Sequence, residues 1–219
     1  MACRLFRFAV AMALAWGLGF GAVTVHASDL TCLIHPHATI TITAPLSAVI
    51  ESITVERGDL VKEGQVLATL DSSVERSSGA VAAAEAEMSN HYLADLQLQR
   101  TAAEVARRTI RSPINGVVVE RYMSAGEYPK EEKIFKLAQI HPLRVEVYAP
   151  IAMLGKVHVG QEAIVKPEDP IAGTYKAKVT IVDRVIDAGS GTVGIRLELP
   201  NPDLKVPAGL KCTARFNSK

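Results

Sequence analysis

An internal repeat at an offset of 68 residues constrains this 219-residue chain more than any other feature of its sequence. Residues 44–50, Ala-Pro-Leu-Ser-Ala-Val-Ile, match residues 112–118, Ser-Pro-Ile-Asn-Gly-Val-Val, in character and order. Each copy then reaches a glycine followed by an acid: Gly58 and Asp59 in the first, and Gly126 and Glu127 in the second. A fixed spacing of this kind indicates two copies of one supersecondary unit.

Each unit reads as strand, glycine turn, strand, turn and strand, because short apolar runs are separated by glycine and charged residues. We predict structural turns at four glycines, with positive φ at the first and last of them: Gly58, Gly64, Gly116 and Gly126. A unit of about 27 residues exposes an apolar face that it cannot bury alone. The two units, residues 44–71 and 111–139, are therefore expected to close one small β-sandwich.

Between the units, residues 72–110 are rich in alanine, glutamate, leucine and arginine, a composition typical of α-helix. One helix of this length would measure about 57 Å and would pull the two halves of the sandwich apart. The segment is therefore expected to fold back at residues 89–91 into a short α-helical hairpin, capped at Ser72 or Ser73. Three apolar residues recur every seven positions, as in a coiled coil: Val74, Val81 and Met88. The hairpin surface is either a partner contact, which we favour, or a solvated arm.

The remaining chain, residues 140–219, contains alternating runs separated by proline, glycine and asparagine. This pattern predicts a small antiparallel β-barrel, with one short helix within residues 151–157. A strand within residues 28–43 is expected to join the barrel region, and its alternating run 39–43 is expected to pair with the last strand. The predicted fold class is therefore mainly β with a short α-helical hairpin.

The amino end has the pattern of an export signal. Arg4 and Arg7 precede an apolar run over residues 8–23, and small residues follow it, which predicts a signal peptide over residues 1–27. The alternative is an uncleaved membrane anchor, although a spanning helix needs about 20 residues. Cleavage would leave 22 basic and 23 acidic residues, a balance that gives no support to nucleic-acid binding.

Two cysteines, Cys32 and Cys212, remain after that cleavage, in a compartment that permits disulfides. They lie near the first and last strands of the mature chain, so that both can belong to the terminal barrel. We expect a disulfide between them, which would close a loop of roughly 180 residues and constrain the unfolded chain. The alternative is two separately buried thiols.

Residues 55–67, Val-Glu-Arg-Gly-Asp-Leu-Val-Lys-Glu-Gly-Gln-Val-Leu, resemble a run that is familiar in biotinyl/lipoyl domains. A split lipoyl-like β-sandwich that encloses a helical hairpin and precedes a β-barrel is similar to the membrane fusion family. These are periplasmic adaptors of the haemolysin secretion protein D type, as in resistance-nodulation-division efflux pumps. Residues 109–118 and 206–211 also resemble motifs of that family, the second being its closing turn.

The resemblance implies a non-enzymatic periplasmic adaptor, associated with the inner membrane and without a cofactor. Its implied partners are an inner-membrane transporter, further copies of the chain and, if the short hairpin reaches it, an outer-membrane channel. Glu104 stands where the family's hairpin tip motif has leucine, so that motif is not carried over. A stand-alone periplasmic binding or regulatory module is the alternative function.

No residues predict catalysis, because no serine or cysteine nucleophile has a recognisable base and acid. A lipoyl or biotin carrier needs an acceptor lysine after the first half, and no lysine occurs between Lys62 and Lys130. The His-Pro-His segment, residues 35–37, is interpreted as a rigid surface turn rather than a metal site. The candidate partner contacts are two residues at the hairpin tip and two in a barrel loop: Asn90, His91, Ile151 and Leu154.

Overall fold

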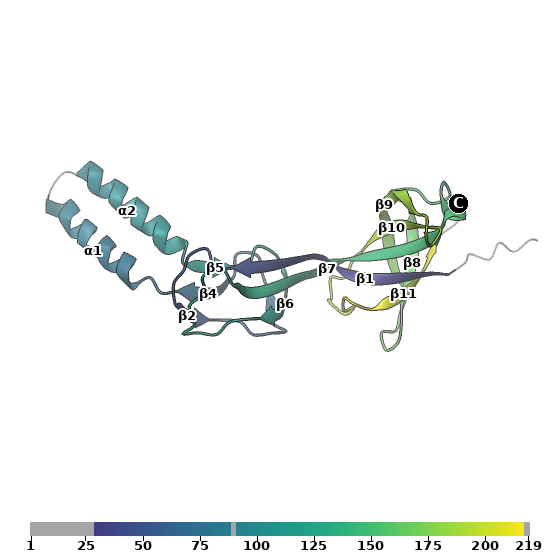
Figure 1. Cartoon of the computed structure of the whole chain (residues 1–219), viewed down its shortest axis with the longest axis horizontal. Helices are drawn as coiled ribbons and strands as arrows, with labels where there is room; N and C mark the ends of the chain where they lie inside the picture. Colours follow the sequence, from purple (N-terminus) through teal and green to yellow (C-terminus); the bar gives the residue numbers. More distant parts are fainter. Residues whose placement is uncertain (1–28, 89–90, 217–219) are drawn as a thin grey trace, which may run out of the picture.

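The computed structural model describes residues 29–88 and 91–216, and its three parts, hairpin, sandwich and barrel, lie in line (Figure 1). This arrangement confirms the predicted fold class: mainly β, with a short helical hairpin, a split sandwich and a small antiparallel barrel. The elements in chain order are β1 (Leu30–Thr43), β2 (Ile50–Ile53), β3 (Leu60–Val61), β4 (Val66–Leu70), α1 (Ser73–Met88), α2 (His91–Ala106), β5 (Thr109–Arg111), β6 (Gly116–Arg121), β7 (Lys133–Pro150), the 3₁₀ helix η1 (Ile151–Met153), β8 (Glu162–Pro167), β9 (Tyr175–Asp187), β10 (Thr192–Leu199) and β11 (Lys211–Phe216).

Two long antiparallel strands, β1 and β7, form a ribbon that runs through both β domains (Figure 1). The pairing extends from Cys32 opposite Val147 to Thr43 opposite Lys133. The 18 residues of β7 alone reach about 60 Å. A register shift after Pro36 divides the ribbon into a barrel part and a sandwich part. One pair of strands therefore determines the position of the barrel relative to the sandwich.

Two expectations about β1 are wrong. Residues 39–43 pair with residues 133–138 of β7, and it is residues 30–33 that pair with the last strand, β11. Residues 35–37 continue the strand instead of forming a turn. Pro36 is tolerated there because it stands beside the register shift, where the regular ladder of hydrogen bonds is already interrupted. In a sequence, the same proline fits a turn and a bulge equally well.

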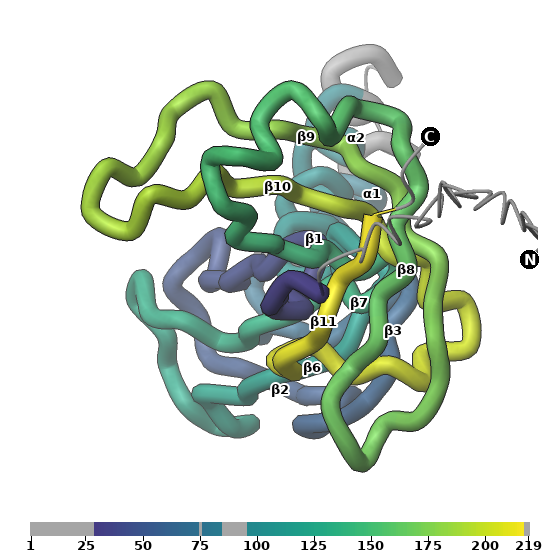
Figure 2. The backbone as a smooth tube through the Cα atoms, turned by 90° about the vertical axis from the view of Figure 1, so that its right-hand side faces the viewer, coloured from purple at the N-terminus to yellow at the C-terminus, as the bar shows by residue number. Residues whose placement is uncertain are grey.

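Six strands close the barrel in the order β1, β11, β8, β9, β10 and β7, and β7 returns to β1 (Figure 2). Buried residues alternate with more exposed ones along β8, β10 and β11, as expected for strands with one face on a core. The buried set is mainly aliphatic, with Ile34, Leu143, Leu197 and Leu199 completely enclosed. Closure pairs each of these strands on both sides, which removes exposed sheet edges.

A disulfide between Cys32 and Cys212 joins the first and last strands of the barrel. The two residues stand directly opposite each other in the ladder between β1 and β11. Their side chains are buried, with 0% and 1% of their surface exposed. The expected disulfide is confirmed, and the alternative of two separate thiols is wrong. The bond spans 180 residues of sequence and so encloses the sandwich, the hairpin and most of the barrel.

The sandwich fills its core from both copies of the sequence repeat. Its small sheet has the order β2, β4 and β5, while β3 pairs with β6, which lies beside β7. The buried apolar residues come from both halves: Ile50, Val55, Leu67 and Leu70 from the first, and Ile110, Val118, Ile134, Phe135 and Leu137 from the second. In either half alone these apolar side chains would be exposed to water, so the two halves must pack together to bury them.

The helices α1 and α2 lie side by side and extend the long axis of the molecule away from the barrel (Figure 1). Each has 16 residues and is therefore about 24 Å long. The expected fold-back at residues 89–91 and the expected signal peptide over residues 1–27 fall largely or wholly outside the described residues. Within the described ranges, no helix has both the length and the apolar character needed to cross a membrane.

Replacing Cys32 and Cys212 together with alanine is expected to lower the free energy of unfolding by about 3 to 5 kcal/mol, because the bond closes a long loop. Urea denaturation followed by circular dichroism measures this loss. Wild-type protein unfolded under reducing conditions is the matched comparison, since it loses the bond but keeps both side chains. Unchanged midpoints in both samples would contradict a stabilising role for the disulfide.

Candidate partner-binding surfaces

The two glycine turns of the repeat connect the halves of the sandwich. Gly58 and Gly126 have φ of +96° and +90°, in the left-handed region that favours glycine. The Gly58 N–H donates to the Val118 carbonyl, and the Gly126 N–H donates to the Ile50 carbonyl, each at 2.8 Å. Val118 and Ile50 are themselves equivalent positions of the repeat. Each turn is therefore held by a strand of the other half.

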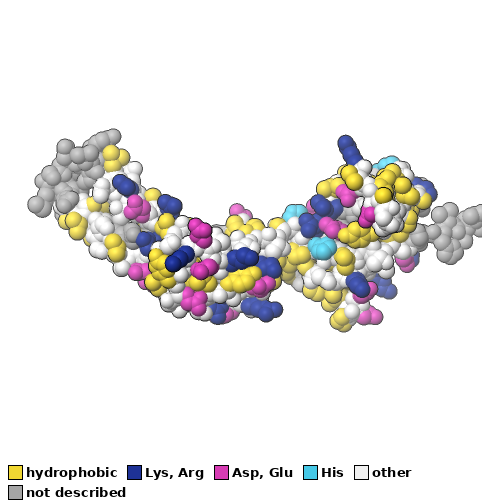
Figure 3. Space-filling view, viewed as in Figure 1, with side chains coloured by type: hydrophobic (Ala, Val, Ile, Leu, Met, Phe, Trp, Pro, Cys, Tyr) yellow, Lys and Arg dark blue, Asp and Glu magenta, His cyan; other side chains and the backbone are white. Residues whose placement is uncertain are grey.

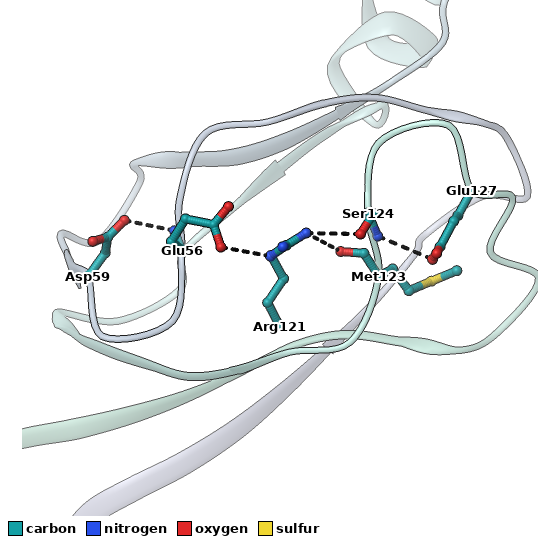
Figure 4. A network of polar contacts seen from close by, with 6 residues as sticks. All are labelled: Glu56, Asp59, Arg121, Met123, Ser124 and Glu127. Carbon is teal, nitrogen blue, oxygen red and sulfur yellow. Dashed lines mark hydrogen bonds and ion pairs between the residues drawn. The ribbon is translucent and has the colours of Figure 1, made fainter.

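Arg121 links the two turns through a short polar network (Figure 4). Its Nε donates to Glu56 of the first turn at 3.0 Å. Its Nη1 donates to the Met123 carbonyl and the Ser124 hydroxyl beside the second turn, each at 3.1 Å. In each turn the acid accepts the backbone N–H three residues before it: Asp59 from Glu56, and Glu127 from Ser124. Exposed contacts of this kind add little stability, but they hold the two turns in register.

Gly64 and Gly116 have different reasons to be glycine. Gly64 has φ of +79°, whereas Gly116 begins β6 and lies outside the left-handed region. A Cβ atom at Gly116 would overlap the backbone carbonyl oxygen of Ala138 in β7. Gly116 thus allows β6 to approach β7 closely, a requirement that depends on the partner strand.

Gly116→Ala is expected to lower the free energy of unfolding by about 3 kcal/mol, because the backbone of β7 must move to admit the methyl group. Gly58→Ala is expected to lower it by only about 1 kcal/mol, since its Cβ would meet no atom within 4 Å and backbone strain alone opposes it. Denaturation of the two variants beside wild type checks the order. A larger loss for Gly58→Ala would show that close approach is not the constraint at Gly116.

Asp71 attaches the base of the hairpin to the sandwich. Its Oδ1 accepts the Ser73 N–H, the first of α1, at 2.9 Å, while Ser72, one of the two expected caps, holds the N-cap position and accepts the Arg76 N–H with its carbonyl. The Asp71 backbone carbonyl accepts a hydrogen bond from the Arg108 guanidinium, just after α2. An ion pair of 3.5 Å between Arg76 of α1 and Glu51 of β2 adds a second connection. The hairpin therefore leaves the sandwich in a defined direction.

The pKa of Asp71 lies below its ordinary value, mainly because the Ser73 N–H bonds to the carboxylate, and further because Arg108 and Arg76 are close. A lowered folded-state pKa stabilises the fold above the unfolded-state pKa near 4, and this contribution disappears as pH falls through the folded-state value. Below about pH 4 the helical circular dichroism signal should therefore decline more in wild type than in Asp71→Asn, whose amide oxygen still accepts the Ser73 N–H but does not titrate. Identical acid profiles would exclude this role for the carboxylate.

The hairpin has apolar side chains on its outer surface, and its helices approach each other at a glycine. Gly79 faces Thr101, where an added Cβ would lie 3.0 Å from the Thr101 Cγ2, so glycine lets the helices approach. Val74 and Val81 are 71% and 58% exposed, so these two positions of the seven-residue repeat do not form the contact between α1 and α2. At the tip, Asn90 lies outside the described residues, and only the backbone of His91 is described, as the start of α2.

The two barrel candidates, Ile151 and Leu154, lie at the end of β7. The helix expected over residues 151–157 is a single 3₁₀ turn, Ile151–Met153. Ile151 and Leu154 are 51% and 47% exposed, and apolar side chains are visible over this part of the barrel (Figure 3). The Ile151 N–H donates to the Gly191 carbonyl at 3.1 Å, which places the connection between β9 and β10 beside them. This end of the barrel therefore presents an apolar surface.

Asn201 is a structural residue that the sequence pattern did not single out. Its side chain is buried after β10, and its Nδ2 donates to the carbonyls of Ile140 and Val206, each at 2.9 Å. Its Oδ1 accepts the Val206 N–H at 3.1 Å, and its own N–H donates to His141 Nδ1 at 3.0 Å. The loop after β10 is thus tied to β7 where the barrel meets the sandwich. In sequence, an asparagine after a proline reads only as a turn residue.

The part of the chain that the structure describes contains no candidate metal site. No three His, Cys, Asp or Glu side chains gather there in a way that could hold a metal ion. His35 lies 3.8 Å from Glu146, but the same carboxylate also contacts Arg144 and Arg196. Its negative charge is therefore already shared between guanidinium groups.

Two family models match the chain in succession. Residues 38–139 match the CzcB-like, barrel-sandwich hybrid domain, and residues 143–219 match the CusB-like, beta-barrel domain. The chain belongs to the membrane fusion family of periplasmic adaptor proteins. The family resemblance expected from the two lipoyl-like halves and the closing turn is therefore confirmed.

Solved structures with a similar fold include two that cover nearly the same part of the chain. ZneB from Cupriavidus metallidurans is 25% identical with a TM-score of 0.56, and the match covers 88% of this chain and 98% of ZneB. The membrane fusion protein Spr0693 from Streptococcus pneumoniae R6 shares the fold at 16% identity, with a TM-score of 0.66 over 88% and 99% of the two chains. An uncharacterised Haemophilus influenzae protein is 24% identical over 77% of the adaptor, which spans 51% of that relative's length.

Proposed function

We propose that this adaptor is a non-enzymatic subunit that couples an inner-membrane transporter of an efflux or secretion system to an exit path. The observation that carries the proposal is the in-line arrangement of barrel, sandwich and hairpin along one continuous ribbon (Figure 1). A molecule of this shape presents two well-separated ends. Each end can therefore hold a different partner while the ribbon keeps them at a constant distance.

We assign the barrel end to the transporter. β1 begins and β11 ends at this end, where Leu30 pairs with Ala214 (Figure 1). The residues that precede β1 carry the predicted export signal, so this end follows the part of the chain that meets the inner membrane during export. The exposed Ile151 and Leu154 supply the apolar contact that a protein interface needs at its centre.

We assign the hairpin end to the exit path. An isolated pair of helices of 16 residues each is marginal in water, so contact with a partner would stabilise it. The exposed Val74 and Val81 are apolar positions on α1 that such a partner would cover. The proposed partner is an outer-membrane channel, contacted by the hairpins of several copies in a homo-oligomer. In this assembly the adaptor acts on the periplasmic side of the inner membrane.

Photo-cross-linking in cells tests the assignment of the two ends. A photoreactive side chain at position 154 is expected to capture an inner-membrane transporter, and one at position 81 a different protein. The matched control is position 60, because Leu60 is equally exposed but lies on the sandwich. Mass spectrometry of the adducts identifies the partners. Absence of a transporter adduct from position 154, or equal yields from position 60, would favour the stand-alone module.

A further inference from the structure

A groove on the outer face of β7, β10 and β9 has no part in the assignments above. It has a volume of about 450 Å³ and lies beside the connection between β9 and β10, which projects from the barrel (Figure 2). Its walls include Tyr148, which is 52% exposed, and Val185, which at 83% is the most exposed large apolar side chain described. Asp183 and Asp187 also line it, so the groove combines apolar walls with two carboxylates.

A bulge in β9 forms this groove. Val193 of β10 pairs with Ile186 and Ile195 pairs with Val182, which leaves three residues of β9, 183–185, opposite Gly194 alone. A Cβ atom at Gly194 would overlap the Asp183 carboxylate, so that carboxylate lies over bare backbone. Among the described residues the Asp183 side chain has no hydrogen-bond or ion-pair partner. Bulges redirect side chains in this way, and here the redirected side chain is an unpaired acid.

Asp187 keeps the groove negatively charged. Its Oδ1 accepts the Gly189 N–H at 2.8 Å and the Ser190 N–H at 3.3 Å. These hydrogen bonds hold the pKa of Asp187 below its ordinary value. The neighbouring Arg184 is exposed, but it is not among the residues that line the groove.

A second outer face of the barrel, on β11, β8 and β9, carries an excess of basic side chains, although Glu162 lies on it opposite Lys178. Its exposed basic side chains form what we term the basic ridge: Lys166, Lys176, Lys211 and Arg215. Ile164 lies in the middle of the ridge, because it pairs with Arg215 on one side and with Lys176 on the other. Asp29 neutralises Arg215 through a contact of 2.8 Å, but the three lysines have no ion-pair partner among the described residues.

We propose that the acidic groove of one copy of this chain receives the basic ridge of a second copy. In this contact the two aspartates face the ridge lysines, and Val185 packs against Ile164. Both complementary faces belong to the same chain, which is the argument for a second copy as the occupant. The groove is centred on β10 and the ridge on β8, with β9 between them, so the two faces cannot meet within one molecule.

The contact joins copies head to tail. After one groove is filled, each pair still has a free groove and a free ridge, and association continues until a ring closes. This contact rests on the proposed function, which assumes a homo-oligomer, and it identifies the two surfaces that would form that oligomer. Self-association is measured on purified protein without a transporter, so its failure leaves the assignment of the two ends untouched.

Sedimentation velocity of purified residues 28–219 tests the proposal by charge exchange. Wild type is expected to form oligomers that weaken as salt is raised. Asp183→Lys and Lys176→Glu are each expected to weaken association at least about tenfold, because like charges then face each other. An equimolar mixture of the two variants is expected to associate again, since each altered groove then meets an altered ridge.

Glu131→Lys is the matched control, because it makes the same charge change at an exposed site on the sandwich, and it is expected to associate as wild type does. Circular dichroism of each variant verifies that the fold is kept. A wild-type protein that stays monomeric at all concentrations overturns the proposal. So does a mixture that fails to recover association, and so does capture of a transporter, in place of a second copy, by a photoreactive side chain at position 185.

Discussion

The antiparallel pairing of β1 with β7 is the interaction on which the rest of the structure depends. The barrel part of the ribbon is closed by β11 and the disulfide, and the sandwich part is covered by β6. Both cores are therefore built on the same two backbones. Because backbone hydrogen bonds continue on both sides of the register shift at Pro36, the junction is a narrow ribbon rather than a free linker. Asn201 strengthens it by tying the loop after β10 to β7.

The sandwich explains why a hairpin can be inserted into a repeat without disturbing it. β4 and β5 are neighbours in one sheet, and Thr69 stands opposite Thr109 at the two ends of the insertion. The chain thus leaves and re-enters the sandwich at adjacent positions. A hairpin of any length satisfies that condition, because the entropy of closing the insertion depends only weakly on its length. Hairpin length in an adaptor of this design can therefore vary with the partner, independently of the core.

The exposed surface of the molecule carries several groups that are suited to contacts with other proteins. The exposed side chains that stand out are apolar, on α1 and at the barrel end, or charged, on two neighbouring faces of the barrel. The charged groups of the barrel lie mainly on paired strands, so little conformational entropy is lost when a partner covers them. The disulfide and the paired strands keep the barrel walls fixed relative to each other. This is the property that an assembly subunit requires.

Local patterns in the sequence determined much of this protein. The repeat predicted the sandwich and its glycine turns, helical composition predicted the hairpin, and alternation predicted the barrel that holds Cys32 and Cys212. Tertiary structure alone decided which strand pairs with residues 39–43, why Gly116 must lack a side chain, and that Asn201 holds the junction. It also decided the bulge that brings Asp183 over Gly194. The reason is physical: periodicity reports which face of an element is buried, whereas register and close approach depend on a partner strand that is distant in sequence.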